Sequence, residues 1–115
     1  YSIGAVSDGL MLFMSKTEWG YMDTKGEIVI PAMYSRANPF REGYAWVKTS
    51  TFGNYYCIDK TAKVIFELEE GEAPITDFHN GLSLVQSHDS CIYVNTKGDV
   101  IYSWPDTADS IWDLF

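Results

Sequence analysis

Residues 23–30 read DTKGEIVI, a four-residue polar turn followed at once by an apolar run. The same arrangement recurs as DKTAKVIF at residues 59–66 and as NTKGDVIY at residues 95–102, so each turn begins 36 residues after the previous one. Such a fixed spacing is the signature of tandem structural repeats. The sequence therefore predicts about three copies of one unit within 115 residues.

A second recurring segment precedes each turn. It reads VSDGL at residues 6–10, FREGY at 40–44 and FHNGL at 78–82. From its glycine to the turn there are 14, 16 and 14 residues, and the extra two residues of the middle copy fall around 49–52. Since insertions between homologous units collect in loops, we expect a longer loop there.

The unit is predicted to be built of β-strands. Aromatic residues make up 16% of the chain, which favours pleated, half-buried surfaces. In the middle copy, short apolar runs at 43–47, 55–58 and 63–66 predict three strands. We therefore predict an all-β fold of about three small antiparallel meanders, stacked because one unit cannot bury a core alone. A single domain would span residues 1–115, with units of about 6–39, 40–77 and 78–115.

Local signals refine the unit. Glycine at the fourth turn position suits a positive φ, and Asp or Asn at the first position can accept hydrogen bonds from the turn's own backbone. Ala62 replaces that glycine in the middle copy, which predicts a variant turn there. Pro31 and Pro39 are expected to stop strand pairing in the connector. A short helical turn is expected near residues 106–114.

Composition argues against several partners. Sixteen carboxylates against eight Lys and Arg give a net charge of −8, and no basic run offsets it. We therefore expect no nucleic-acid partner. No 18-residue apolar stretch is present, so no membrane insertion is expected in this segment. The chain starts at Tyr1 in the middle of a pattern, so we expect a piece of a longer protein; cell surface or secretion is preferred over the cytoplasm.

No catalytic set is evident. His79 and His88 are the two imidazoles, and the run Ser87-His88-Asp89-Ser90 has triad residue types only as sequence neighbours, which rarely supply a triad. Cys57 and Cys91 lack zinc-site spacing and are interpreted as buried, reduced residues; the alternative is a disulfide, which requires the fold to bring them together. We expect no enzyme activity and no catalytic, cofactor-binding or metal-binding residues, with no cofactor.

Aromatic side chains are the remaining candidates for binding. Alternation along a strand places Tyr44 and Trp46 on one face and Ala45 and Val47 on the other. Because the positions of Tyr44 and Trp46 are apolar in every copy, packing in the core is the default interpretation. The functional alternative is an exposed aromatic platform for a sugar or peptide, with Tyr44, Trp46 and Tyr55 as the predicted ligand-binding residues.

The stretch from Trp19-Gly20-Tyr21 through Ile30-Pro31, followed by Tyr34 and FREGYAWVK at 40–48, resembles the WG (or KWG) repeat of bacterial proteins over about residues 6–102. The resemblance implies repeated antiparallel β units and adds no catalytic residues. It supports a binding module for a protein or a cell-envelope polymer, in contact with neighbouring repeats or domains of the parent chain. The alternative is a structural scaffold or spacer with no ligand of its own.

Overall fold

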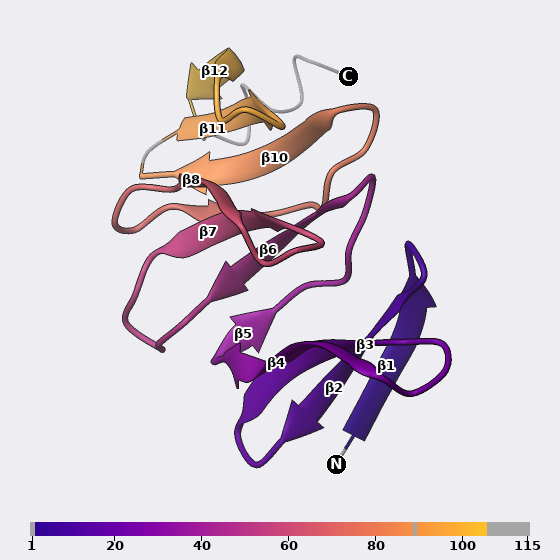
Figure 1. The fold of residues 1–115 in the computed structure, drawn as a ribbon. Helices are drawn as coiled ribbons and strands as arrows, with labels where there is room; N and C mark the ends of the chain where they lie inside the picture. Colours follow the sequence, from indigo (N-terminus) through magenta and orange to yellow (C-terminus); the bar gives the residue numbers. More distant parts are fainter. Residues whose placement is uncertain (1, 89, 106–115) are drawn as a thin grey trace.

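The computed structural model describes residues 2–88 and 90–105. Within them, twelve strands form three four-stranded antiparallel sheets that follow one another along the chain, from indigo to yellow in Figure 1. This part of the chain contains no helix, and therefore none long and apolar enough to cross a membrane. The predicted all-β fold is confirmed, whereas the expected helical turn near 106–114 lies outside the described residues.

Each sheet is a meander in which consecutive strands are neighbours. The first sheet comprises β1 (Ser2–Ser7), β2 (Leu10–Ser15), β3 (Glu18–Asp23) and β4 (Ile28–Tyr34). The second sheet comprises β5 (Arg36–Ala37), β6 (Tyr44–Lys48), β7 (Tyr55–Asp59) and β8 (Val64–Glu67). The third sheet comprises β9 (Ala73–Pro74), β10 (Leu82–Ser87), β11 (Ser90–Asn95) and β12 (Val100–Pro105). The three strands predicted per unit correspond to the last three of each sheet.

The first strand of each sheet was not expected. In the second sheet it is β5, a two-residue strand from the connector, where Arg36 pairs with Lys48 and Ala37 with Val47. β9 takes the same place in the third sheet. A strand of two residues is too short to show a period of two, so the sequence gives no sign of it.

The predicted effect of Pro31 was wrong, because β4 continues through it to Tyr34. Tyr21 pairs with Ile30 and Trp19 with Tyr34, so the single residue Gly20 faces the three residues 31–33. β4 is an edge strand and bulges here. Proline is tolerated at such a position because no partner needs its missing N–H group.

The four-residue turns that recur every 36 residues have the same structure in all three sheets. The first residue accepts two backbone N–H bonds through its side chain, as Asp23 Oδ1 does from Lys25 and Glu27 at 2.9 Å each. Asp59 and Asn95 repeat this pattern. The variant turn expected at Ala62 was wrong, since Ala62 adopts φ 70° and its N–H donates to the Asp59 carbonyl at 3.0 Å. The capping bonds therefore hold alanine in a glycine-like conformation.

A second set of turns, at the glycine anchors, directly precedes the second strand of each sheet. The two central residues have positive φ in every copy: Asp8 and Gly9, Glu42 and Gly43, Asn80 and Gly81. Two positive φ angles in succession identify the two-residue hairpin turn that matches strand twist. We call these three turns the anchor turns.

The anchor turns are linked from one sheet to the next by carboxylates. Asp8 Oδ2 accepts the Gly43 N–H at 2.6 Å. The Glu42 carboxylate accepts the Asn80 and Gly81 N–H groups at 2.7 and 2.8 Å. The acidic residue of one turn thus satisfies backbone donors of the following turn.

Two apolar clusters join the sheets, as the stacking prediction requires. The first lies between the first and second sheets and contains Leu10, Tyr21, Ile30, Tyr34, Phe40, Ala45, Val47 and Ile58. The second lies between the second and third sheets and contains Trp46, Cys57, Leu68, Phe78, Val85, Ile92 and Val94. The second sheet is therefore buried on both faces, and its strand β6 places alternate residues in different clusters.

Candidate functional site

The second sheet differs from the other two in one hairpin. The β2–β3 and β10–β11 connections are two residues long, at 16–17 and 88–89, whereas the β6–β7 connection spans residues 49–54. The two-residue insertion seen in the sequence therefore opens a tight hairpin into a wide loop. Phe52 stands on this loop with 97% of its surface exposed.

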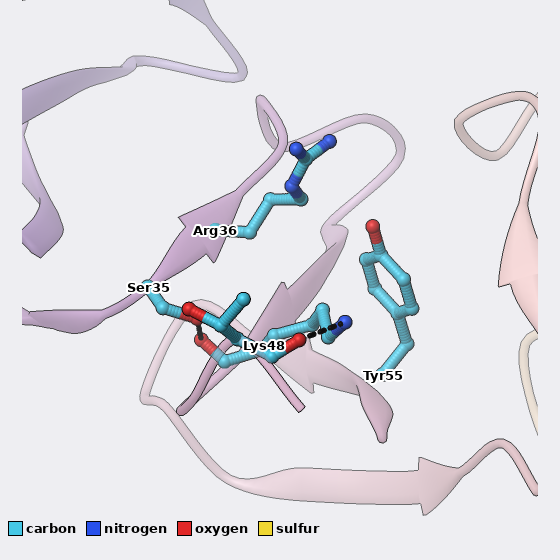
Figure 2. A pocket seen from close by; sticks show the side chains of 5 residues that line it. Ser35, Arg36, Lys48 and Tyr55 are labelled. Carbon is cyan, nitrogen blue, oxygen red and sulfur yellow. Dashed lines mark hydrogen bonds between the residues drawn. The ribbon is translucent and has the colours of Figure 1, made fainter. Parts of the chain in front are cut away.

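A pocket of about 200 Å³ lies beside this loop, lined by Ser35, Arg36, Lys48, Thr51 and Tyr55 (Figure 2). The Lys48 ammonium donates to the Thr51 carbonyl at 3.0 Å and lies 5.0 Å from the centre of the Tyr55 ring. The Ser35 hydroxyl donates to the Lys48 carbonyl at 3.4 Å. In Figure 2 the Arg36 guanidinium and the Tyr55 hydroxyl project to the same side. The pocket thus combines two cations with three hydroxyl-bearing residues, one of which, Tyr55, also supplies an aromatic ring.

Three of these residues form one row across the sheet. Arg36 pairs with Lys48, and Lys48 pairs with Tyr55, in register across β5, β6 and β7. The corresponding pairs in the other sheets are Met14 with Trp19 and Gln86 with Cys91. The charged row is therefore a property of the second sheet and does not recur with the repeat.

The three aromatic residues predicted as ligand-binding lie in different surroundings. Trp46 is fully buried, stacks on Phe78 with ring centres 5.5 Å apart, and donates its indole N–H to the Ser83 hydroxyl at 3.0 Å. Tyr44 is half-buried, with its ring 5.7 Å from that of Phe78. Tyr55 lines the pocket. Tyr44 and Trp46 share a face as predicted, and only Tyr55 of the three is placed to meet a ligand in this pocket.

The imidazoles and thiols do not join this pocket. His79 is exposed beside an anchor turn, and His88 is in the tight β10–β11 hairpin, as the loop interpretation predicted. Asp89 lies outside the described residues. Cys57 and Cys91 are both buried and are not joined in a disulfide, and burial raises the pKa of the Cys57 thiol to about 12. Among described residues, no three His, Cys, Asp or Glu side chains gather as metal ligands.

A second hollow of about 390 Å³ separates β8 and its following loop from the third sheet. Its apolar lining includes Phe66, Leu68 and Ile92, which belong to the second cluster or pack against it. Of the acidic residues at its rim, Glu72 accepts the Ser87 hydroxyl at 2.5 Å and the Glu69 N–H at 2.8 Å. This hollow is a gap between stacked sheets, and the Glu72 carboxylate at its rim bonds within the fold.

Four pocket residues were missed by sequence reasoning: Ser35, Arg36, Lys48 and Thr51. The insertion at 49–52 marked the loop. The facing strand β5 was not expected, so the register that sets Arg36 opposite Lys48 could not be inferred.

The Trp-Gly pair explains the geometry around Pro31. Trp19 pairs with Tyr34 at the far side of the β4 bulge and packs against the first cluster, while Gly20 faces the bulge itself. A family model of the WG containing repeat matches residues 19–50. This stretch is similar to a WG repeat. The resemblance predicted from the sequence is confirmed there, and the match includes Ser35, Arg36 and Lys48.

The remaining pocket residues, Thr51 and Tyr55, follow directly after the matched WG repeat. A comparison with curated proteins finds no match to this sequence.

Proposed function

We propose that this WG-repeat chain is a non-catalytic binding module that recognises a protein or a cell-envelope polymer through the pocket beside the 49–54 loop. The observation that carries the proposal is the restriction of this pocket to one sheet. The turns and clusters recur because they hold the array together. The wide loop and the charged row occur in the second sheet, and the other two described sheets form without them. Ligand binding therefore explains these two features better than stabilisation of the fold does.

The chemistry of the lining favours binding over catalysis. None of its five described residues is an imidazole, a thiol or a carboxylate. The Lys48 ammonium is held by the Thr51 carbonyl and points away from the Ser35 hydroxyl in Figure 2. A hydroxyl nucleophile needs a base within hydrogen-bond reach, and Ser35 instead donates to a backbone carbonyl.

The test is an NMR titration of the isotope-labelled chain with soluble fragments of cell-envelope polymers and with peptide pools. We expect shifts confined to Lys48, Thr51 and Tyr55 and their neighbours, and their loss in a Phe52→Ser/Tyr55→Ala variant. Ile28→Ser is the matched control, because Ile28 is 60% exposed and lies on the first sheet, away from the pocket. Absence of any pocket response across the panel would refute the proposal.

A spacer role is the second candidate. It is favoured by the two clusters and the turn-to-turn carboxylate bonds, which order the sheets without using the pocket. A spacer predicts that no fragment perturbs the pocket and that the Phe52→Ser/Tyr55→Ala variant behaves as the wild type in the titrations.

A further inference from the structure

The charges of Arg36 and Lys48 are placed unfavourably for the fold. The two residues are direct cross-strand partners, and like charges in that position destabilise a sheet. Neither cation has a carboxylate partner among the residues the structure describes, although the chain has 16 carboxylates and only eight Lys and Arg. Arg41, by contrast, lies 4.0 Å from Asp77. The cross-strand cations are therefore arranged for something outside the chain.

We infer that the pocket binds a carboxylate-bearing sugar unit of an acidic polysaccharide, an inference that rests on the binding function proposed above. The guanidinium of Arg36 is exposed and presents a planar fork of donors that matches a planar carboxylate. The Lys48 ammonium has three N–H donors and donates one of them to the Thr51 carbonyl, which leaves two for a ligand. Together they supply the charge-assisted hydrogen bonds that one carboxylate can accept.

The net charge of −8 repels any anion at long range. The proposed carboxylate is therefore held at short range, by charge-assisted hydrogen bonds to Arg36 and Lys48.

The other lining groups favour a sugar ring over a peptide. Ser35, Thr51 and Tyr55 carry hydroxyls that can donate to or accept from ring hydroxyls. The Tyr55 ring, and Phe52 at 97% exposure on the adjoining loop, offer flat apolar faces. β5 is an edge strand, but the pocket beside it is compact and lined by polar side chains, unlike the apolar grooves that hold peptides.

The test uses trigalacturonic acid as the probe, its fully methyl-esterified form as the neutral analogue, and triglutamate as the acidic peptide. Binding is measured by isothermal titration calorimetry at low and high salt. We expect the acid to bind, and the ester to bind about tenfold to a hundredfold more weakly, because charge-assisted hydrogen bonds are lost. Arg36→Gln should weaken binding of the acid by a similar factor. Lys25→Ala, which removes one exposed cation from a turn of the first sheet, should not.

Each alternative outcome has a distinct meaning. If the ester binds as well as the acid and depends on Tyr55 but not on Arg36, the binding function stands and the carboxylate inference falls. If triglutamate binds and the sugar does not, the ligand is a peptide and the inference is overturned. If none of the three probes binds, the inference fails, and the proposed function is then judged by the wider panel described above. Urea unfolding of Arg36→Gln verifies that the fold is intact.

Discussion

The backbone of Pro31 passes close to Gly20, in space that a side chain at Gly20 would fill. A Cβ atom built on Gly20 would lie 2.6 Å from the Ile30 carbonyl oxygen and 2.8 Å from the Pro31 carbonyl carbon. In the second and third sheets, Tyr56 and Ile92 stand at the position of Gly20, and they pair regularly with Glu67 and Ser103. The glycine and the proline bulge thus occur together or not at all in this chain.

Gly20→Ala is therefore expected to lower the free energy of unfolding by about 1–3 kcal/mol, because the methyl group meets backbone that cannot rotate away. Urea denaturation followed by circular dichroism measures the loss. Gly53→Ala is the control, since its nearest neighbour at 2.9 Å is the movable Ser50 hydroxyl. Equal stability of the two variants would contradict the close approach described here.

The recurring turns allow a matched pair of substitutions. Gly26 and Gly98 have φ values of 86° and 90°, but a Cβ on Gly26 meets nothing within 4 Å, whereas one on Gly98 lies 2.7 Å from Phe66 Cγ. Gly26→Ala should cost only the backbone strain, about 1–2 kcal/mol. Gly98→Ala should cost more in the same denaturation experiment, because Phe66 packs against the second cluster. The opposite order would mean that Phe66 is free to move.

The bond from Trp46 to Ser83 predicts a coupled pair. Ser83→Ala leaves the buried indole N–H without its acceptor and should cost about 1–3 kcal/mol. Trp46→Phe removes the donor as well as part of the packing. In a double-mutant cycle the two losses should therefore sum to more than the loss of the double variant, by about 1 kcal/mol. Simple additivity would show that the bond contributes nothing.

Asp59 predicts an acid-sensitive turn. The Thr61 hydroxyl, which donates to its carboxylate at 2.6 Å, is the main cause of a lowered pKa, with backbone N–H bonds from Thr61 and Lys63 adding to it. A lowered pKa in the folded state means that the stabilisation is present above the pKa of a free Asp, about 3.9, and is lost as the pH falls through the lowered value.

Asp59→Asn keeps an oxygen acceptor, as Asn95 does in the third sheet, but does not titrate. The wild type should be the more stable of the two at pH 7, and the difference should shrink as the pH is lowered below about 4. Thermal unfolding of both proteins from pH 7 to pH 2 measures it. A difference that stays constant with pH would exclude Asp59 as its source.

Local signals predicted much of the fold, and long-range contacts account for the rest. The turns, the anchor glycines and three strands per sheet follow from residue types at fixed spacing. Ala62 was misjudged because the Asp59 capping bonds outweigh the preference of one residue. Pro31 was misjudged because the absence of a side chain at Gly20, eleven positions earlier, makes room for the bulge.

The candidate site shows the same division. Tyr55 was identified from its residue type, and the loop beside it from the insertion. Arg36 and Lys48 come together only through β5, a strand with no periodic signal. The burial of Trp46 agrees with the core-packing interpretation of its position, whereas the element that covers it, the third sheet, is not indicated by the residues of β6.

The carboxylates of the anchor turns run in one direction, from Asp8 to the second sheet and from Glu42 to the third. Every unit in the middle of such an array therefore supplies a carboxylate that accepts N–H bonds from the next anchor turn along the chain. It also presents its own backbone N–H groups to the carboxylate of the preceding anchor turn. Duplicating a middle unit in the gene would supply both halves of each new junction at once, so arrays of this kind can lengthen without inventing a new interface. Because of this direction, a unit inserted in the reverse orientation would not place its carboxylate against the backbone donors of the next anchor turn.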